Sequence, residues 1–354
     1  MSSKKLLIKQ TDDHYKGLPN EITFIPGKGI AVHGGGNKKN IASFNALDVL
    51  GYNYIRNPEF FYREKGHTFS FIASEAGEPM VSDFLCEGYK LGCRGIDTQV
   101  SIDNPSSLIP SKGITFSLTE KLGNSKDYIC LFQQNMLEIR AFAGKKVTLS
   151  FDAMASSPVN ISTSLIFSFH SETPDKQRHG GVLSIGTKNN RFSVEFDMPE
   201  LDEGTVFGNY AMTRVWLWLA AGSNYRNRAG EIGTNSREIT INNIQLEIGK
   251  SKGFTPLNRE LENLKVGAFY EKITLDWFLP NLGSTDGETD SVIATIPFKY
   301  RKWATPRADK ITLQVSNMTD ESIYRRDRDG IVVMGTATST IAARVTEITI
   351  DREV

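Results

Sequence analysis

The sequence is poor in cysteine and has no long apolar run. Its 354 residues include three cysteines, too few for the disulfide framework of a small secreted domain. We therefore expect Cys86, Cys93 and Cys130 to be reduced and buried in a protein synthesised in the cytoplasm. The apolar run Leu6–Ile8 is shorter than the core of a signal peptide. No stretch approaches the about 20 apolar residues that a membrane-spanning helix needs, so membrane insertion is not expected.

The chain also lacks an internal repeat and an excess of charge of either sign. Its Lys and Arg residues (41) balance its Asp and Glu residues (41), giving a formal net charge of +0. A nucleic-acid partner is therefore not expected, because such partners favour a basic surface. Without a repeat, the long β-helix of some glycan-degrading fibres is not expected either. The chain length favours two or three domains.

What the sequence does contain is alternation of apolar and polar residues, which predicts half-buried β-strands. The stretches KKVTLSFDAMA and RFSVEFDMP show it at Val147, Leu149, Phe151, Phe192, Val194 and Phe196. The stretch RVWLWLAAGS is apolar at most positions, which indicates a central strand buried on both faces, with Trp216 and Trp218 in the core. The predicted fold class is all-β, with a jelly-roll β-sandwich as its largest part.

Changes in this pattern divide the chain into four expected parts. They are a short β-rich N-terminal segment (1–45), the jelly-roll domain (46–257), a linking α-helix (258–272) and a small C-terminal β-sandwich (273–354).

The linking helix is predicted from Leu261, Leu264 and Ala268, which lie at helical spacing after Asn258 as a potential N-cap. Its apolar positions could pack on the jelly roll or line a threefold axis. We favour packing on the jelly roll.

Two short motifs raise the question of an acyl-transfer site. The stretch IAVHGGGNKKN contains an HGGG segment of the kind that supplies an oxyanion-hole N–H in lipases, and GKSKG fits the G-x-S-x-G pattern with Ser251 at its centre. However, every histidine precedes Ser251, whereas the catalytic histidine of α/β-hydrolases follows the nucleophile. We therefore interpret the HGGG segment as a glycine-rich tight turn. An esterase remains a remote alternative.

Glycan cleavage would need two carboxylates held across a sugar. The stretch VEFDMPELDEG contains five: Glu195, Asp197, Glu200, Asp202 and Glu203. Glu195 and Asp197 fall on one face of a predicted strand, which we interpret as the solvent face. A glycan hydrolase is therefore also a remote alternative, and no enzymatic activity is expected.

Calcium is the one ion for which ligand-rich turns are present, and no other cofactor is expected. TDGETD offers Asp286, Glu288 and Asp290, and DRDG offers Asp327 and Asp329. Neither turn has the full loop of an EF-hand.

Carbohydrate binding without catalysis needs aromatic faces and a few well-placed polar side chains. The loop AAGSNYRNRAGEIGTNS supplies our candidate glycan-binding residues: Asn224, Tyr225, Arg226, Asn227 and Arg228. A second polar loop, SETPDKQRHGG, brings His170 and His179 into consideration as ligands, although their spacing fits no metal pattern.

Segments spread over most of the chain resemble, in order, a group of bacteriophage tail-fibre and virion proteins. They are YIRNPEFFYREKGHTFSF, FAGKKVTLSFDAMA, INNIQLEIGKSKGFTPLNRELENL with the following AFYEKI, and IPFKYRKWATPRADKITL. The resemblance covers roughly residues 52–315. The sequence departs from the family at Tyr62–Gly66, where the family has Trp-Gln-Arg-Gly, and it lacks the family's cysteine before the helix end.

This resemblance implies a carbohydrate-binding-module-like jelly roll, a linking helix and a small C-terminal β domain on a phage particle, often as a homotrimer. We expect a structural, non-enzymatic virion protein of the tail-fibre or receptor-binding type that attaches to host-surface glycans. The alternative is a capsid decoration or head-fibre protein. The N-terminal segment, with His33, Gly34, Gly35 and Gly36 as candidate anchoring residues, would dock onto other virion proteins.

Overall fold

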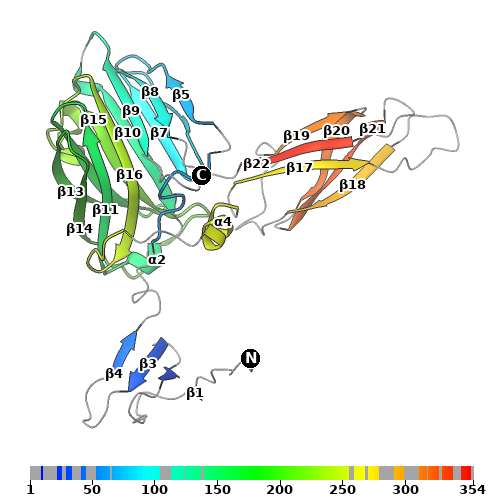
Figure 1. Ribbon diagram of the computed structural model, residues 1–354, viewed down its shortest axis with the longest axis horizontal. Helices are drawn as coiled ribbons and strands as arrows, with labels where there is room; N and C mark the ends of the chain where they lie inside the picture. The colour runs from blue at the N-terminus through cyan, green and yellow to red at the C-terminus, as the bar shows by residue number, and fades with distance from the viewer. Residues whose placement is uncertain are drawn as a thin grey trace.

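The computed structural model describes the central part of the chain almost continuously and the flanking parts mainly as strands and one helix. The described residues are 9–10, 22–25, 29–33, 41–44, 53–63, 66–103, 113–123, 125–136, 139–254, 259–267, 270–278, 291–298, 311–316, 318–326, 329–337 and 344–351. The molecule is all-β with short helical segments, as the alternation in the sequence predicts (Figure 1).

Two six-stranded antiparallel sheets form the large sandwich. Sheet 1 has the strand order β13 (Lys176–Ile185), β12 (Val159–Ser168), β15 (Met212–Ala221), β10 (Ile129–Met136), β7 (Tyr89–Arg94), β6 (Val81–Phe84). Sheet 2 has the order β14 (Asn190–Asp197), β11 (Lys146–Ala155), β16 (Arg237–Ile248), β9 (Ile114–Glu120), β8 (Ile96–Ile102), β5 (Thr68–Phe71). The strand from RVWLWLAAGS is β15, which lies inside sheet 1 between β12 and β10 as predicted.

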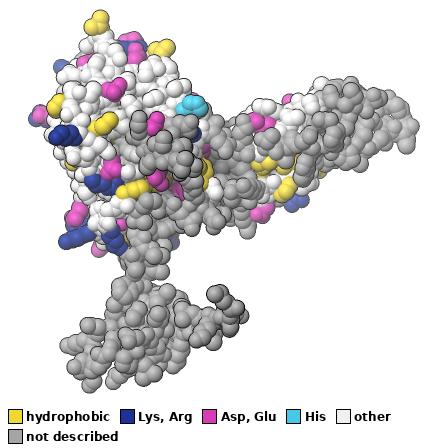
Figure 2. Space-filling view, in the orientation of Figure 1, with side chains coloured by type: hydrophobic (Ala, Val, Ile, Leu, Met, Phe, Trp, Pro, Cys, Tyr) yellow, Lys and Arg dark blue, Asp and Glu magenta, His cyan; other side chains and the backbone are white. Residues whose placement is uncertain are grey.

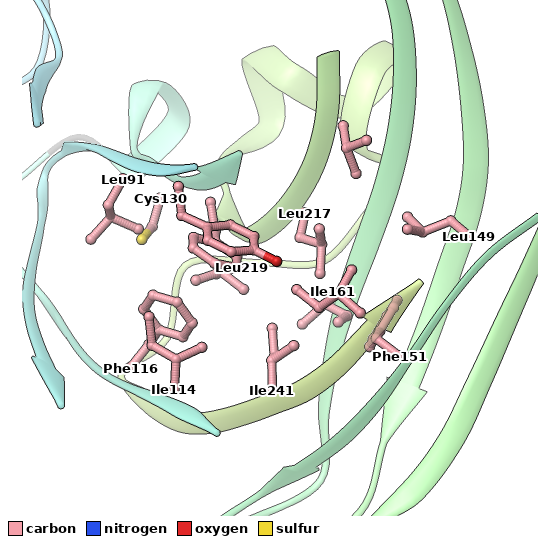
Figure 3. Packing of buried hydrophobic residues seen from close by; sticks show 14 of the residues in the cluster. Leu91, Ile114, Phe116, Cys130, Leu149, Phe151, Ile161, Leu217, Leu219 and Ile241 are labelled. Carbon is pink, nitrogen blue, oxygen red and sulfur yellow. The ribbon is translucent and has the colours of Figure 1, made fainter. Parts of the chain in front are cut away.

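Apolar side chains of the two sheets meet in one core. Figure 3 shows Leu217 and Leu219 of sheet 1 facing Phe116 and Ile241 of sheet 2. The predicted inward positions Val147, Leu149 and Phe151 are all fully buried. Burial of each such side chain contributes about 1.5–3 kcal/mol. The apolar side chains that alternation places on one face of each strand therefore hold the two sheets together.

All three cysteines lie in this core as free thiols, as expected for small buried hydrophobes. Cys93 and Cys130 are direct partners across β7 and β10, with their Sγ atoms 3.6 Å apart. Burial, with Cys93 beside it, raises the pKa of the Cys130 thiol, so the thiol form is favoured.

Four short helical segments lie within the sandwich: η1 (Ser125–Asp127), α2 (Ile139–Phe142), η2 (Ser223–Tyr225) and α3 (Arg226–Ala229). A longer helix, α4 (Arg259–Gly267), follows the last strand of sheet 2. Among the described residues, no helix is both long and apolar enough to cross a membrane.

Helix α4 is shorter than the predicted 258–272, because Tyr270–Lys272 already belong to strand β17. The helix ends at Gly267, a poor helix former, and the following segment YEKITLDWF is rich in the aromatic and β-branched residues that favour strands. The side chains of Leu261 and Leu264, and residue Ala268, lie outside the described residues.

Polar side chains connect α4 to the start of the large sandwich. Lys265 Nζ donates to the carbonyl of Asn53 at 2.8 Å, and Glu262 Oε1 accepts from the backbone N–H of Asn57 at 2.5 Å. The helix therefore contacts the sandwich of its own chain through these polar groups, and the predicted packing of its apolar positions falls outside the described residues.

The C-terminal part is a second, smaller sandwich. One sheet has the order β17 (Tyr270–Phe278), β22 (Arg344–Asp351), β19 (Ile311–Ser316), and the other β18 (Ser291–Pro297), β21 (Gly330–Ala337), β20 (Met318–Arg326). Val333, Val345 and Ile348 are fully buried in its separate core. A four-stranded N-terminal sheet contains β1 (Lys9–Gln10), β2 (Ile22–Ile25), β3 (Gly29–His33) and β4 (Ile41–Phe44).

The visible surface of the large sandwich carries charges of both signs. In Figure 2, Lys and Arg side chains are interspersed with Asp and Glu side chains over this face. This mixture agrees with the net charge of +0.

Candidate functional site

The outer face of sheet 1 is the side turned away from the core between the sheets. In β15, Val215, Leu217 and Leu219 belong to that core. Because side chains alternate along a strand, Arg214, Trp216 and Trp218 point to the outer face.

The loop after β15, which we call the capping loop (222–234), folds back over this face. Its path is fixed by hydrogen bonds from Gly222 N to Tyr128 O (2.8 Å) and from Ala221 N to Gly233 O (3.0 Å). A Cβ at position 222 would lie 2.0 Å from the carbonyl oxygen of Ser125. Only glycine allows this close approach, so the capping loop and η1 lie directly against each other.

Beneath the capping loop lies a small apolar cluster that is separate from the main core. It is formed by Ile129, Leu131, Trp218, Ala221, Ala229 and Ile232. Trp218 is fully buried there, and its indole Nε1 donates to Ser164 Oγ at 3.1 Å. Trp216 packs at the edge of the cluster and is half-buried. The two tryptophans are thus packing residues as predicted, but they pack under the loop and not between the sheets.

Two of the five candidate residues hold the capping loop onto these tryptophans. The Arg228 guanidinium lies 5.0 Å from the ring centre of Trp216 and 5.7 Å from that of Trp218, a cation–π geometry. The ring of Tyr225 packs 6.0 Å from that of Trp218, and the Tyr225 hydroxyl accepts from Arg94 Nη2. Arg228 and Tyr225 therefore stabilise the loop from below.

The other three candidates lie closer to the surface. Asn224 Nδ2 donates to Asp127 Oδ1 of η1 at 2.5 Å. Arg226 forms an ion pair with Glu231 whose two side chains are about two-thirds exposed. Asn227 is exposed.

A hollow of about 260 Å³ opens between the capping loop and η1. It is lined by Ser125, Lys126, Ala221, Gly222, Ser223, Arg226, Gly230, Glu231, Gly233 and Thr234. Of the five candidates, Arg226 alone lines it. Ser125 and Lys126 could not be assigned to this site from the sequence, since they precede the loop by almost one hundred positions and match no motif.

The two histidines considered as ligands do not share a site. His179 pairs with Ser164 across β13 and β12, whereas His170 follows the far end of β12. The Nε2 atom of His170 lies 2.7 Å from Arg214 Nη2. Arg214 had no signal of its own in the sequence beyond its place in the alternation of β15.

The anchoring and calcium candidates fall largely outside the described residues. His33 is the last residue of β3, and Gly34, Gly35 and Gly36 are not described. Asp286, Glu288, Asp290 and Asp327 are not described either, and Asp329 is exposed. Among the residues that are described, no group of three or more His, Cys, Asp or Glu side chains is arranged to hold a metal ion.

Of the residues considered for hydrolysis, Glu195 and Asp197 are exposed and Ser251 is partly buried. Glu195 and Asp197 share one face of β14, as period 2 predicts, and both contact Lys146 Nζ, at 3.4 and 3.0 Å. Hydrogen bonds from Lys146 to Asp197 and Glu195 raise the pKa of the Lys146 ammonium. Ser251 Oγ accepts from the N–H of Gly253 at 3.4 Å, within the turn that follows β16.

Comparison with known proteins gives no family. No family model matches the chain, and no curated protein matches it. Solved structures with a similar arrangement include the enzymatically active domain of bacteriophage CBA120 tailspike protein 4, at 11% identity and a TM-score of 0.30, over 56% of this chain and 21% of that one.

Carbohydrate-binding modules are among the other neighbours. The xylan-binding domain CBM22-2 of Paenibacillus barcinonensis Xyn10C has 13% identity and a TM-score of 0.30, over 45% of this chain and 91% of that one. The family 11 module of a Clostridium thermocellum cellulosomal cellulase has 13% identity and a TM-score of 0.30, over 50% of this chain and 99% of its own. The neighbours of this chain are thus jelly-roll carbohydrate-binding modules and a phage tailspike domain, all at low identity.

Proposed function

We propose that the large sandwich binds a glycan through the hollow between the capping loop and η1, and that the protein is a non-enzymatic virion protein of the tail-fibre or receptor-binding type. The observation that carries the proposal is the hollow itself, because it gathers polar groups on a rigid base. The phage assignment is supported by the resemblance of the sequence segments quoted above.

The groups that line the hollow suit the hydroxyls of a sugar. Ser125 and Ser223 bring hydroxyls that can both donate and accept hydrogen bonds, whereas the Thr234 hydroxyl donates to Glu120 Oε1 and can still accept. The Arg226 guanidinium is a donor and the Glu231 carboxylate an acceptor, and the two lie side by side as an ion pair. A volume of about 260 Å³ is slightly below that of drug-sized sites. One sugar unit of a longer chain therefore fits the hollow better than a large ligand does.

The base of the hollow is rigid before any ligand arrives. The Arg228–tryptophan contacts and the Gly222–η1 contact hold the capping loop. A loop that is already ordered loses less conformational entropy on binding. This favours binding by weak hydrogen bonds, which cannot offset a large ordering cost.

Titration of the full-length protein with polysaccharide from the host cell surface tests the proposal. We expect Arg226→Ala to weaken binding at least about tenfold, because a lost charge-assisted hydrogen bond costs about 1.5–3 kcal/mol. Arg178→Ala is the matched control, because Arg178 is an exposed arginine of β13 that donates to the carbonyls of Asp197 and Gln177. No release of new reducing ends is expected during the titration. Equal affinities of the two variants, or no binding by the unaltered protein, would contradict the proposal.

A particle experiment tests the location. Labelled antibody should mark the tail in electron micrographs of intact phage, and the purified protein should have the mass of three copies. Labelling of the capsid would favour the decoration or head-fibre alternative.

A further inference from the structure

Arg214 lies on the outer face of sheet 1 at the opposite end of β15 from the hollow. It is half-buried, and among the described residues it forms no ion pair. Its Nη2 group donates to His170 Nε2 at 2.7 Å, while its Nε–H has no acceptor in the described structure. Burial lowers the pKa of the Arg214 guanidinium, which means that its surroundings disfavour the positive charge.

The nearest carboxylate does not neutralise this charge by direct contact. Asp175 acts on Arg214 from a distance, and its oxygens accept from Ser168 Oγ (2.9 Å) and Phe169 N (3.1 Å). A charge removed from water without a partner is costly. The guanidinium of Arg214 therefore lacks an anion.

A second buried arginine shows the contrast. Arg237 is also partly desolvated, but it donates to the carbonyls of Asn235, Asn160 and Ile232 at 2.7, 3.1 and 3.2 Å. Its hydrogen-bonding capacity is met by the protein itself. Within the described structure, the Arg214 guanidinium has a single acceptor, the Nε2 atom of His170.

The backbone beside Arg214 has an unusual conformation at His170. His170 has φ 48°, which is uncommon for a residue other than glycine, and such positions often occur at functional sites. Gly208 holds it there, since its N–H donates to Phe169 O at 2.8 Å and a Cβ on it would lie 1.9 Å from His170 O. Tyr210, which is 37% exposed, presents its ring 6.4 Å from that of His170 at 72°.

Two more arginines on this face, Arg94 and Arg228, also form no ion pair within the described structure. On sheet 2, by contrast, Arg191 pairs with Asp152, and Lys146 pairs with Glu195 and Asp197. Arg214, Arg94 and Arg228 thus form no ion pair within the described structure, although Arg226 of the capping loop pairs with Glu231 and Lys176 of β13 pairs with Asp202.

We propose that Arg214, with His170 and Tyr210 beside it, binds the carboxylate of an acidic sugar. Arginine suits this task because its planar guanidinium matches a carboxylate. The proposal rests on the proposed function and adds the class of glycan to it. Ala221 at the hollow lies seven positions after Arg214 in β15, a distance of about 23 Å along a strand. A glycan of several units could reach both places.

Binding of a uronic-acid oligosaccharide and of its carboxyl-reduced neutral form tests this directly, since the two probes differ only in the anion. We expect the unaltered protein to bind the acidic form at least about tenfold more tightly, with the preference weakened by salt. Arg214→Gln should abolish the preference, and Arg214→Lys should restore part of it. Arg226→Ala should weaken both forms equally, and Arg178→Gln should change neither.

Free glucuronate is itself one sugar unit that fits the hollow, so its binding at Arg214 is measured in the Arg226→Ala background. It should raise the melting temperature of Arg226→Ala, but not that of the double variant Arg214→Gln/Arg226→Ala. Tyr210→Ala, at a partly exposed position, should fold normally and show a smaller shift.

The possible failures are distinguishable. Equal binding of both oligosaccharides, or a glucuronate shift that persists in the double variant Arg214→Gln/Arg226→Ala, would overturn the anion site and leave glycan binding standing. A glucuronate shift without oligosaccharide binding would support the anion site and contradict the proposed function. The absence of both the glucuronate shift and oligosaccharide binding would contradict the anion site and the proposed function together.

Discussion

Trp218 connects the scaffold to the candidate site. Its fully buried ring packs with Leu131 and Ala229 on one side of β15, and its indole N–H is satisfied by Ser164. The capping loop packs on this ring through Tyr225, Arg228 and the apolar cluster that includes Ala229 and Ile232. Removing the ring would therefore leave a cavity directly under the loop that lines the hollow.

We predict that Trp218→Ala destabilises the protein by about 3–5 kcal/mol, the usual cost of removing a large buried aromatic side chain. Urea unfolding followed by circular dichroism measures the change. Leu122→Ala is the control, because Leu122 is 99% exposed and surface substitutions stay within about 0.5 kcal/mol. A loss below about 1 kcal/mol for Trp218→Ala would mean that the loop is held by other contacts.

At the residue scale, alternation predicts which side chains are buried but not what buries them. Val147, Leu149 and Phe151 are buried as expected because one face of β11 meets the core. Trp216 and Trp218 also fit an apolar strand, yet their cover is a loop whose path depends on Gly222 and η1. Likewise, Arg214 meets His170 only because β12 and β15 are neighbours in the sheet. Such pairings come from topology, which local pattern does not encode.

Among the elements, α4 is attached to the large sandwich by buried polar groups. Glu262 is 4% exposed, and desolvation raises the pKa of its carboxyl group from the usual 4.5, although Lys265 and the Asn57 N–H act in the opposite direction. A raised folded-state pKa means that the protonated form suits the folded protein better than the unfolded chain. The stabilisation from protonated Glu262 is fully present below about pH 4.5. It is lost as the pH rises through the folded-state pKa.

Glu262→Gln should therefore remove the loss of stability that accompanies ionisation of Glu262 at higher pH. The amide oxygen can still accept from the Asn57 N–H, so we expect the variant to unfold at a higher urea concentration than the unaltered protein at pH 7 and at a similar one near pH 4. Glu75→Gln, at an exposed position, should leave the pH dependence unchanged. If the stability of Glu262→Gln depends on pH in the same way as that of the unaltered protein, another group is responsible.

The strands and the helix were not equally predictable. Strands of the large sandwich follow from period-2 patterns because each has one face on a single core. The C-terminal end of α4 was misplaced because Ala268 and Phe269 continue the helical spacing, while pairing of Tyr270–Phe278 with β22 favours a strand. Tertiary pairing thus overrides the local pattern at this boundary.

Besides the small apolar cluster under the capping loop, the described residues form two separate cores. One draws its buried side chains from Ile55 to Leu246, and the other from Ile296 to Ile350. Deletion of residues 1–45 removes no side chain of these two cores.

Deletion of residues 1–45 should leave the melting temperature of the rest within a few degrees, because neither described core is touched. If this segment anchors the protein, the shortened protein should fail to join phage particles. Complementation of a phage lacking the protein, followed by immunoblotting of purified particles, measures incorporation. Incorporation at the normal level would contradict the anchoring role of His33 and the glycine run.

The placement of Arg228 over two indole rings also provides an optical signal. Trp216 and Trp218 are two of the four tryptophans of the chain, and both lie beneath the loop that lines the hollow. A ligand that shifts the capping loop would change the distance between the guanidinium and the rings, and with it the wavelength and intensity of the tryptophan emission. The unlabelled protein could thus report on movement of this loop by its own fluorescence.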